Sequence, residues 1–199
     1  DVSKIKFLDV MVINVGDTEC LLQQVSYTGD HGFELYCDPM AQRSLWDTLW
    51  TAGRPDGITP FGMRAMMSLR LDRFFGSWMT EFSPDYTAAE TGLDRFISFK
   101  KNTDFIGRAA AEAERATPPD RQLIVFEVEA SDADVVAYEP VFIDGEVQGF
   151  CTSGGYSHHA EKSIAFALVP RGRAKVDLEV EIEILGQRCI ARRIIEPLI

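Results

Sequence analysis

Hydrophobic and polar positions in the first part of the chain predict strands that alternate with helices. Residues 21–27 and 33–37 are β-rich runs joined by a glycine-containing turn over residues 28–32, and this arrangement predicts a β-hairpin. Apolar residues at helical spacing follow over residues 41–52, and a second helical pattern covers residues 61–71. The first part of the chain therefore has an α+β pattern.

The pattern changes after residues 117–120, where Thr-Pro-Pro-Asp breaks the chain. Beyond this point the chain reads as five or six short strands, with clear alternation over residues 178–184, so we expect a small antiparallel β-barrel. The predicted strands cover residues 123–129, 141–143, 146–150, 163–169, 178–184 and 189–195. Asp144-Gly145 predicts a type I′ turn between the second and third of them. We predict two domains, residues 1–117 and residues 118–199.

The composition limits the partners of the chain. A net charge of -11 argues against nucleic acid or an anionic membrane as the main partner, because both attract basic surfaces. No apolar run approaches the ~20 residues that span a bilayer, and no signal peptide opens the chain. Four cysteines without CxxC spacing and only three histidines argue against zinc and iron–sulfur sites. Free thiols in a reducing compartment, the cytoplasm, are expected.

Motifs of the common catalytic sites do not occur in the sequence. It contains no P-loop, no GxGxxG after a strand, no HExxH and no nucleophile elbow. Ser153-Gly154-Gly155 precedes no helix, so a tight turn is favoured over a phosphate cradle. His158 and His159 are adjacent, so their rings diverge. An exposed loop pair is favoured over a pair of metal ligands.

The predicted hairpin carries a candidate ligand-binding carboxylate. Phe33, Leu35 and Cys37 share one face of its second strand, so Glu34 and Tyr36 share the other. A carboxylate on a rigid strand can accept two parallel N–H bonds from an amidine-like edge. A pterin presents such an edge through its 2-amino group and N3. The alternative, which these residues alone favour, is that Glu34 faces water.

Five short segments share motifs with one known family. Residues 26–35 read Ser-Tyr-Thr-Gly-Asp-His-Gly-Phe-Glu-Leu, and residues 68–72 read Ser-Leu-Arg-Leu-Asp. Residues 86–93 read Tyr-Thr-Ala-Ala-Glu-Thr-Gly-Leu, residues 104–108 Asp-Phe-Ile-Gly-Arg, and residues 151–154 Cys-Thr-Ser-Gly. In this order they resemble motifs of the aminomethyltransferase family, typified by the glycine-cleavage T protein. The resemblance covers nearly the whole chain.

Three further segments point to a branch of that family. Residues 62–68, 154–159 and 195–198 resemble the folate domains of sarcosine and dimethylglycine dehydrogenases or oxidases. Those proteins oxidise an N-methyl amine in an N-terminal flavin domain, and their folate domain then captures the one-carbon unit. The resemblance thus implies FAD only for an upstream domain outside this chain.

The resemblance implies a fold and a cofactor. Residues 1–117 would be the second half of a folate-binding α+β domain, and residues 118–199 the family's barrel. Tetrahydrofolate would be the cofactor, and its N5 would accept the one-carbon unit derived from an N-methyl amine. Glu34 would hold the pterin edge, with Tyr27 and Phe75 lining the pocket. The upstream half of the same polypeptide would be the partner of this portion.

The chain also departs from the family pattern. Met66 stands where the T protein has an arginine that holds the folate. The family's catalytic aspartate lies in the preceding half of the folate domain, so no catalytic residue is assigned and this portion is expected to be inactive alone. Arg70 has the charge to hold the anionic folate tail, but a structural salt bridge is favoured.

Two alternative functions remain within this family. One is a non-catalytic folate-binding or interaction protein, whose Lys-Gly-Cys-x-x-Gly-Gln-Glu motif is absent from the corresponding residues 101–108. The other is a folate-dependent demethylase that transfers a methyl group rather than a methylene group. The residues that would distinguish this demethylase lie in the preceding half.

Overall fold

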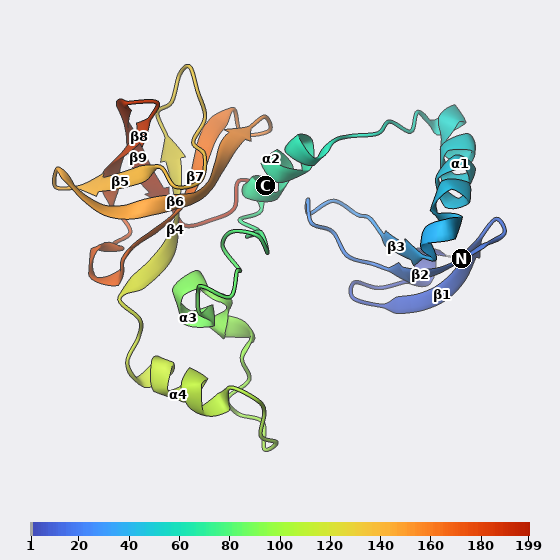
Figure 1. Cartoon of the computed structure of the whole chain (residues 1–199), viewed down its shortest axis with the longest axis horizontal. Coiled ribbons are helices and arrows are strands. Elements are labelled where there is room, and N and C mark those ends of the chain that lie inside the picture. The colour runs from blue at the N-terminus through green and yellow to red at the C-terminus, as the bar shows by residue number, and fades with distance from the viewer. Residues whose placement is uncertain (1) are drawn as a thin grey trace. The chain divides into compact units, whose positions relative to one another are not determined.

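The structure, a computed structural model, describes residues 2–199. The chain forms two compact units, one ending at Met66 and the other comprising Met67–Ile199. The division falls inside helix α2 (Met63–Asp72). Figure 1 shows a small sheet with helix α1 in the first unit and a barrel in the second. The predicted domain boundary after residue 117 stays a prediction.

The first unit contains a three-stranded antiparallel sheet in the order β1-β2-β3. Its strands are β1 (Val10–Val15), β2 (Thr18–Gln23) and β3 (Glu34–Cys37). The predicted hairpin is confirmed, since Cys20 lies opposite Cys37 and Gln23 opposite Glu34. Its strands are shorter than predicted, so the connection runs over residues 24–33 rather than 28–32.

Helix α1 (Gln42–Gly53) follows β3 through a short 3-10 helix that begins at Pro39. The Asp38 carboxylate accepts a hydrogen bond from the Met40 amide at 2.8 Å and caps this segment. The described 3-10 helices cover Val2–Lys4, Pro39–Ala41, Arg54–Asp56, Leu93–Phe96 and Arg171–Arg173. None of the described helices is long and apolar enough to cross a membrane.

The second unit is built around a closed antiparallel barrel with the strand order β4-β7-β6-β5-β8-β9. The barrel strands are β4 (Arg121–Val128), β5 (Pro140–Ile143), β6 (Glu146–Ser157), β7 (Lys162–Pro170), β8 (Glu179–Ile184) and β9 (Gln187–Ile194). Helices α3 (Ala88–Thr91) and α4 (Arg108–Ala116) precede the barrel in the chain. The predicted fold, an α+β portion followed by a small antiparallel barrel, is confirmed.

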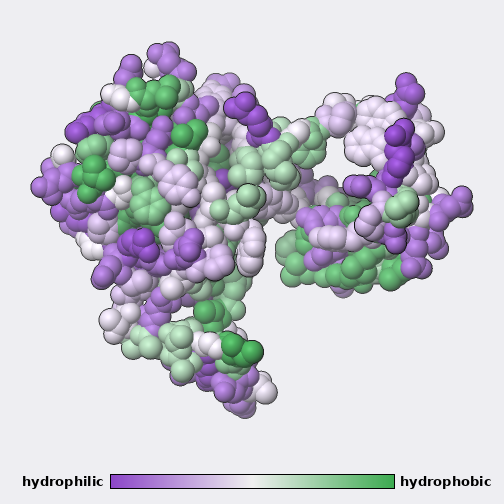
Figure 2. Space-filling model, in the orientation of Figure 1, coloured by the Kyte–Doolittle hydropathy of each residue, from purple (hydrophilic) through white to green (hydrophobic). Residues whose placement is uncertain are grey.

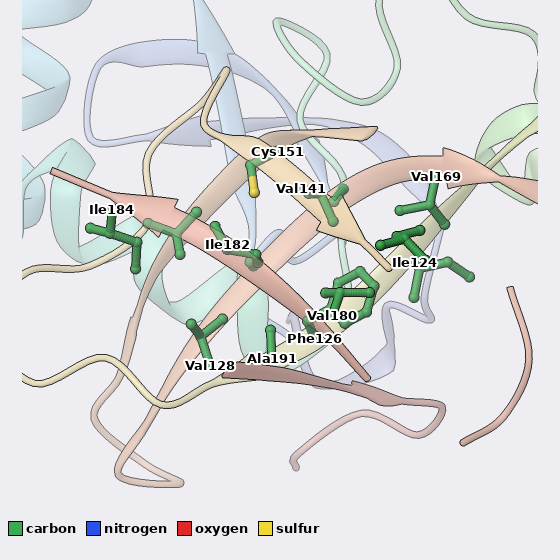
Figure 3. Close-up of a cluster of buried hydrophobic side chains, with 14 residues drawn as sticks. Ile124, Phe126, Val128, Val141, Cys151, Val169, Val180, Ile182, Ile184 and Ala191 are labelled. Carbon is green, nitrogen blue, oxygen red and sulfur yellow. The ribbon is translucent and has the colours of Figure 1, made fainter. Parts of the chain in front are cut away.

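The barrel interior is filled by apolar side chains from all six strands (Figure 3). Phe126, Val141 and Ile182 have no exposed surface. A second apolar cluster lies on the outer side of β4 and β7, where Leu71 packs with Ile164 and Phe166. This outer cluster attaches the end of α2 to the barrel wall.

The turn predicted at Ser153-Gly154-Gly155 is wrong, because these residues lie inside β6. Gly154 pairs with Ala165 of β7, and its φ is not in the left-handed region. Its role is close approach: a Cβ on Gly154 would lie 2.4 Å from the Val135 carbonyl oxygen. His158 and His159 are exposed in the turn that follows β6, as the loop-pair interpretation predicts.

Candidate functional site

Glu34 is the first residue of β3, and its carboxylate is exposed. The predicted alternation is present, since Leu35 and Cys37 are half-buried while Glu34 and Tyr36 are exposed. The Tyr36 hydroxyl donates a hydrogen bond to Oε2 of Glu34. This hydrogen bond, with the negative charge of Glu34, raises the pKa of Tyr36 above its ordinary value. Tyr36 therefore helps to orient the carboxylate.

The face of the sheet that carries Glu34 is open within the first unit. Glu34 lies opposite Gln23, Tyr36 opposite Leu21, and Leu21 also pairs with Val12. Leu21 is 41% exposed and Val12 is 64% exposed. Figure 2 shows hydrophobic residues gathered along the strands of this unit. A carboxylate therefore stands at one end of an exposed apolar surface, an arrangement suited to a flat ring with a polar edge.

Helix α1 covers the opposite face of the sheet. Leu45 of α1 is buried, and together with Leu35 and Cys37 it lines a groove of about 550 Å³ between α1 and β3. The groove is mostly apolar, and the Glu34 carboxylate is not among its lining residues. Tyr36 also lines this groove, so within β3 Glu34 is the residue that does not contribute to it.

Tyr27 lies in the connection between β2 and β3, not in a strand, and it is half-buried. Polar side chains beside it interact with one another, because the Thr28 hydroxyl contacts Ser26 at 3.4 Å and donates to Asp30 at 3.2 Å. Tyr27 thus lies in the loop of the hairpin whose second strand begins at Glu34. Phe75, the third predicted folate-binding residue, belongs to the second unit.

Phe75 lies in a loop that follows α2, and it is 39% exposed. Its amide donates a hydrogen bond to the Arg70 carbonyl at 3.0 Å. Its carbonyl accepts a hydrogen bond from Nη1 of Arg70 at 2.9 Å. Trp78 and Met79, a few residues further on, are largely exposed. The loop thus presents aromatic and apolar side chains while the backbone of Phe75 is held on both sides by one arginine.

Arg70 and Glu81 form a buried ion pair. Their side chains are 1% and 0% exposed, and Nη1 of Arg70 lies 3.1 Å from Oε2 of Glu81. Burial alone would raise the pKa of Glu81, but the Arg70 guanidinium and hydrogen bonds from Ser153 and Ser77 hold that pKa below its ordinary value. The structural salt bridge predicted for Arg70 is confirmed. The sequence did not identify Glu81 as the partner of Arg70.

Two more of the segments that resemble family motifs, residues 86–93 and residues 104–108, also place polar side chains in internal contacts. Thr87 and Glu90 form a reciprocal capping box at the start of α3, and Glu90 also pairs with Arg121 at 2.9 Å. Arg108 donates to Glu112 at 2.9 Å and to the Phe99 carbonyl at 3.3 Å. These motifs hold the structure together, and their polar groups are not presented to a ligand.

Within the described part of the chain, no group of three or more His, Cys, Asp or Glu side chains is arranged to hold a metal ion. All four cysteines are free. Cys151 points into the barrel interior (Figure 3), and burial raises the pKa of its thiol.

Two family profiles match the chain in sequence order. The profile described as the GCVT N-terminal domain matches residues 1–101. The profile described as the glycine cleavage T-protein C-terminal barrel domain matches residues 121–199. Together they cover the sheet, helices α1 to α3 and the barrel, and α4 lies between the two matches.

Curated relatives are similar along almost the whole chain. Dimethylglycine dehydrogenase, mitochondrial, is 36% identical in Mus musculus and 37% identical in Homo sapiens, each over 98% of this chain and 22% of the relative. An aminomethyltransferase of Geobacillus sp. (strain WCH70) is 33% identical over 99% of this chain and 54% of the relative. The chain thus spans about a fifth of the dehydrogenases and about half of the aminomethyltransferase.

A solved structure has the same fold. The glycine cleavage system aminomethyltransferase T from Bartonella henselae superimposes with a TM-score of 0.87 at 21% identity. The match covers 99% of this chain and 54% of that one.

Proposed function

Because the chain belongs to the glycine-cleavage T-protein family, we propose that it is the C-terminal portion of a tetrahydrofolate-dependent protein that accepts a one-carbon unit from an N-methyl amine. The family's N-terminal domain binds tetrahydrofolate, and residues 1–101 match that domain. Dimethylglycine dehydrogenases among the relatives support an N-methyl amine as the source of the one-carbon unit. The cytoplasm stays our prediction for its location.

The observation that carries the proposal is the Glu34 carboxylate on the open face of the sheet. It is exposed, it is oriented by Tyr36, and exposed apolar side chains lie beside it. A pterin ring offers two parallel N–H donors on one edge and two flat faces. The two N–H donors fit a carboxylate, and the flat faces fit an apolar surface. The residues present therefore fit the group that the family binds.

The residues have separate roles in this proposal. Glu34 would accept the hydrogen bonds of the pterin edge, while Tyr27 and Phe75 would line the pocket. Bound tetrahydrofolate supplies a nucleophilic nitrogen, N5, which takes up the one-carbon unit. The protein contributes mainly by holding the reactants together. We assign no catalytic residue in this chain, and we expect the preceding half of the folate-binding domain to be required for activity.

Titration of the complete polypeptide with tetrahydrofolate by isothermal titration calorimetry tests the proposal. Glu34→Gln should weaken binding about tenfold or more, because a charge-assisted bidentate contact is replaced by a neutral amide that can accept at only one of its two positions. Glu19→Gln is the matched control, since Glu19 is an exposed carboxylate on β2 of the same sheet. If the two variants bind equally well, the pterin assignment of Glu34 is wrong.

The amine class needs a separate assay. With tetrahydrofolate withheld, and with an electron acceptor supplied to reoxidise the flavin of the upstream domain, the complete polypeptide should release formaldehyde from dimethylglycine or sarcosine. With tetrahydrofolate present, the one-carbon unit should appear as methylenetetrahydrofolate. Folate binding without turnover of either amine would contradict the dehydrogenase proposal, and it would favour the non-catalytic alternative.

A further inference from the structure

The Glu81 carboxylate is a junction between the loop that follows α2 and the barrel. Oε2 accepts a hydrogen bond from the Ser77 amide at 2.7 Å and another from the Thr80 hydroxyl at 2.7 Å. Oε1 accepts a hydrogen bond from the Ser153 hydroxyl, which comes from the middle of β6. The carboxylate therefore ties the loop to one barrel strand, and all of these groups lie in the second unit.

Arg70 extends this network to Phe75. One nitrogen, Nη1, donates both to Glu81 at 3.1 Å and to the Phe75 carbonyl at 2.9 Å. The guanidinium also lies over the Phe166 ring, 5.1 Å from its centroid. Phe166 belongs to β7, so a second barrel strand fixes the position of the arginine. The position of Phe75 is thus set through Arg70 by two strands of the barrel.

Stability alone does not explain why charged groups occupy this place. A buried ion pair often stabilises a fold no more than well-packed apolar residues of similar volume would. An ion pair with several directed hydrogen bonds does, however, define one geometry more narrowly than apolar contacts do. Here the geometry so defined is that of a loop whose Phe75 and Trp78 side chains are exposed. A loop that presents aromatic surface in a fixed position is suited to receive a flat ligand.

We propose that Ser153 and Glu81 are positioning residues that act through Arg70 to hold Phe75 in place for the pterin ring. This inference rests on the proposed function, because Phe75 is one of its folate-lining residues. The barrel then takes part in folate binding without touching the folate. The proposal also gives the Cys151-Thr152-Ser153-Gly154 motif a role that its sequence did not reveal.

Ser153→Ala in the complete polypeptide tests the proposal, with Ser163→Ala as the matched control. Both serines are buried barrel hydroxyls that donate to a carboxylate: Ser153 to Glu81, and Ser163 to Asp134 at 2.9 Å. Both variants should lower the melting temperature similarly. Only Ser153→Ala should raise the Kd for tetrahydrofolate, by about fivefold, which corresponds to about one net hydrogen bond.

A double-mutant cycle separates positioning from a general loss of stability. If Ser153 acts through Phe75, Ser153→Ala should have no further effect on the Kd in a Phe75→Ala background. An equal effect in both backgrounds overturns the proposal. If Ser153→Ala does not fold, Thr80→Val replaces it, because it removes another hydrogen bond to Glu81 from a half-buried position. The same cycle with Phe75→Ala then applies.

The outcomes distinguish this inference from the proposed function. Wild-type protein that does not bind tetrahydrofolate overturns both. Wild-type protein that binds, together with equal Kd values for Ser153→Ala and Ser163→Ala, overturns only the positioning role. The expected pattern, a selective loss that disappears without Phe75, supports both.

Discussion

Gly154 offers a sharp test of how the barrel is packed. It lies in β6 opposite Ala165. A Cβ at this position would lie 2.4 Å from the Val135 carbonyl oxygen and 2.5 Å from the Val135 Cβ. Val135 is 1% exposed and belongs to the barrel core, so it has little room to retreat. Gly154→Ala must therefore displace the backbone around Val135, in the segment between β4 and β5.

The adjacent residue, Gly155, provides the matched control. A Cβ there would meet only Cδ1 of Leu71, at 3.3 Å, which is the far end of a flexible side chain. In a strand, replacing glycine with alanine ordinarily stabilises by about 0.5–1 kcal/mol, and this gain applies to both positions. Overpacking a core opposes it by about 1–3 kcal/mol, and this penalty applies only at Gly154. The new Cβ would lie far too close to both the carbonyl oxygen and the Cβ of Val135. We therefore expect Gly154→Ala to lower the free energy of unfolding by about 2 kcal/mol.

The measurement is urea denaturation followed by far-ultraviolet circular dichroism, with the slope of the transition checked for each variant. Gly155→Ala should raise the free energy of unfolding by about 0.5–1 kcal/mol, because only the flexible end of the Leu71 side chain lies near the new methyl group there. Hydrogen exchange of the β6 and β7 amides should show the loss locally in Gly154→Ala. Equal stability of the two variants would refute the reasoning, because it would mean that Val135 can move away freely.

Two further predictions concern buried titratable groups. Glu81→Gln should lower the free energy of unfolding by about 3 kcal/mol, because it leaves the Arg70 charge buried and unpaired; chemical denaturation measures this loss. The pKa of Glu81 in the folded protein lies below its ordinary value of 4.5. The ionised carboxylate therefore stabilises the fold fully above pH 4.5, and this stabilisation is lost as the pH falls through the folded pKa. Glu81→Gln should consequently make the free energy of unfolding less dependent on pH on the acid side. Iodoacetamide at pH 8 should label Cys37 and Cys189 but spare Cys151, whose pKa is raised by burial, and peptide mass spectrometry would detect any exception.

The barrel could be predicted from local patterns. Along β8, Val180, Ile182 and Ile184 are buried while the glutamates between them are not, so the period of the strand is visible in the sequence. Asp144 and Gly145 have φ values of 55° and 83°, as a type I′ turn requires. Each of these features depends on residues that are close together in the chain.

Other features depend on distant residues and could not be predicted. Ser153 and Glu81 are 72 positions apart, and neither stands in a pattern that reveals its partner. Gly154 is visible as a glycine, but the carbonyl that requires it belongs to another segment. Strand β1 reads Val-Met-Val-Ile-Asn-Val and lacks the polar alternation of a half-buried strand. The sequence pattern therefore does not predict this strand, and in the first unit both of its faces are largely exposed.

The contacts of the shared motifs separate what supports the fold from what supports a ligand. In the second unit, the side chains of Arg70, Glu90 and Ser153 form ion pairs or hydrogen bonds with other residues of the chain. These motifs therefore argue for the fold, and a protein that keeps them could lack any ligand. Glu34 is different, because its carboxylate is exposed, accepts a hydrogen bond from Tyr36 and lies on a face of the sheet with exposed apolar side chains. The folate proposal consequently depends on Glu34 far more than on the number of matching motifs, and a Glu34→Gln variant that keeps the barrel intact tests it directly.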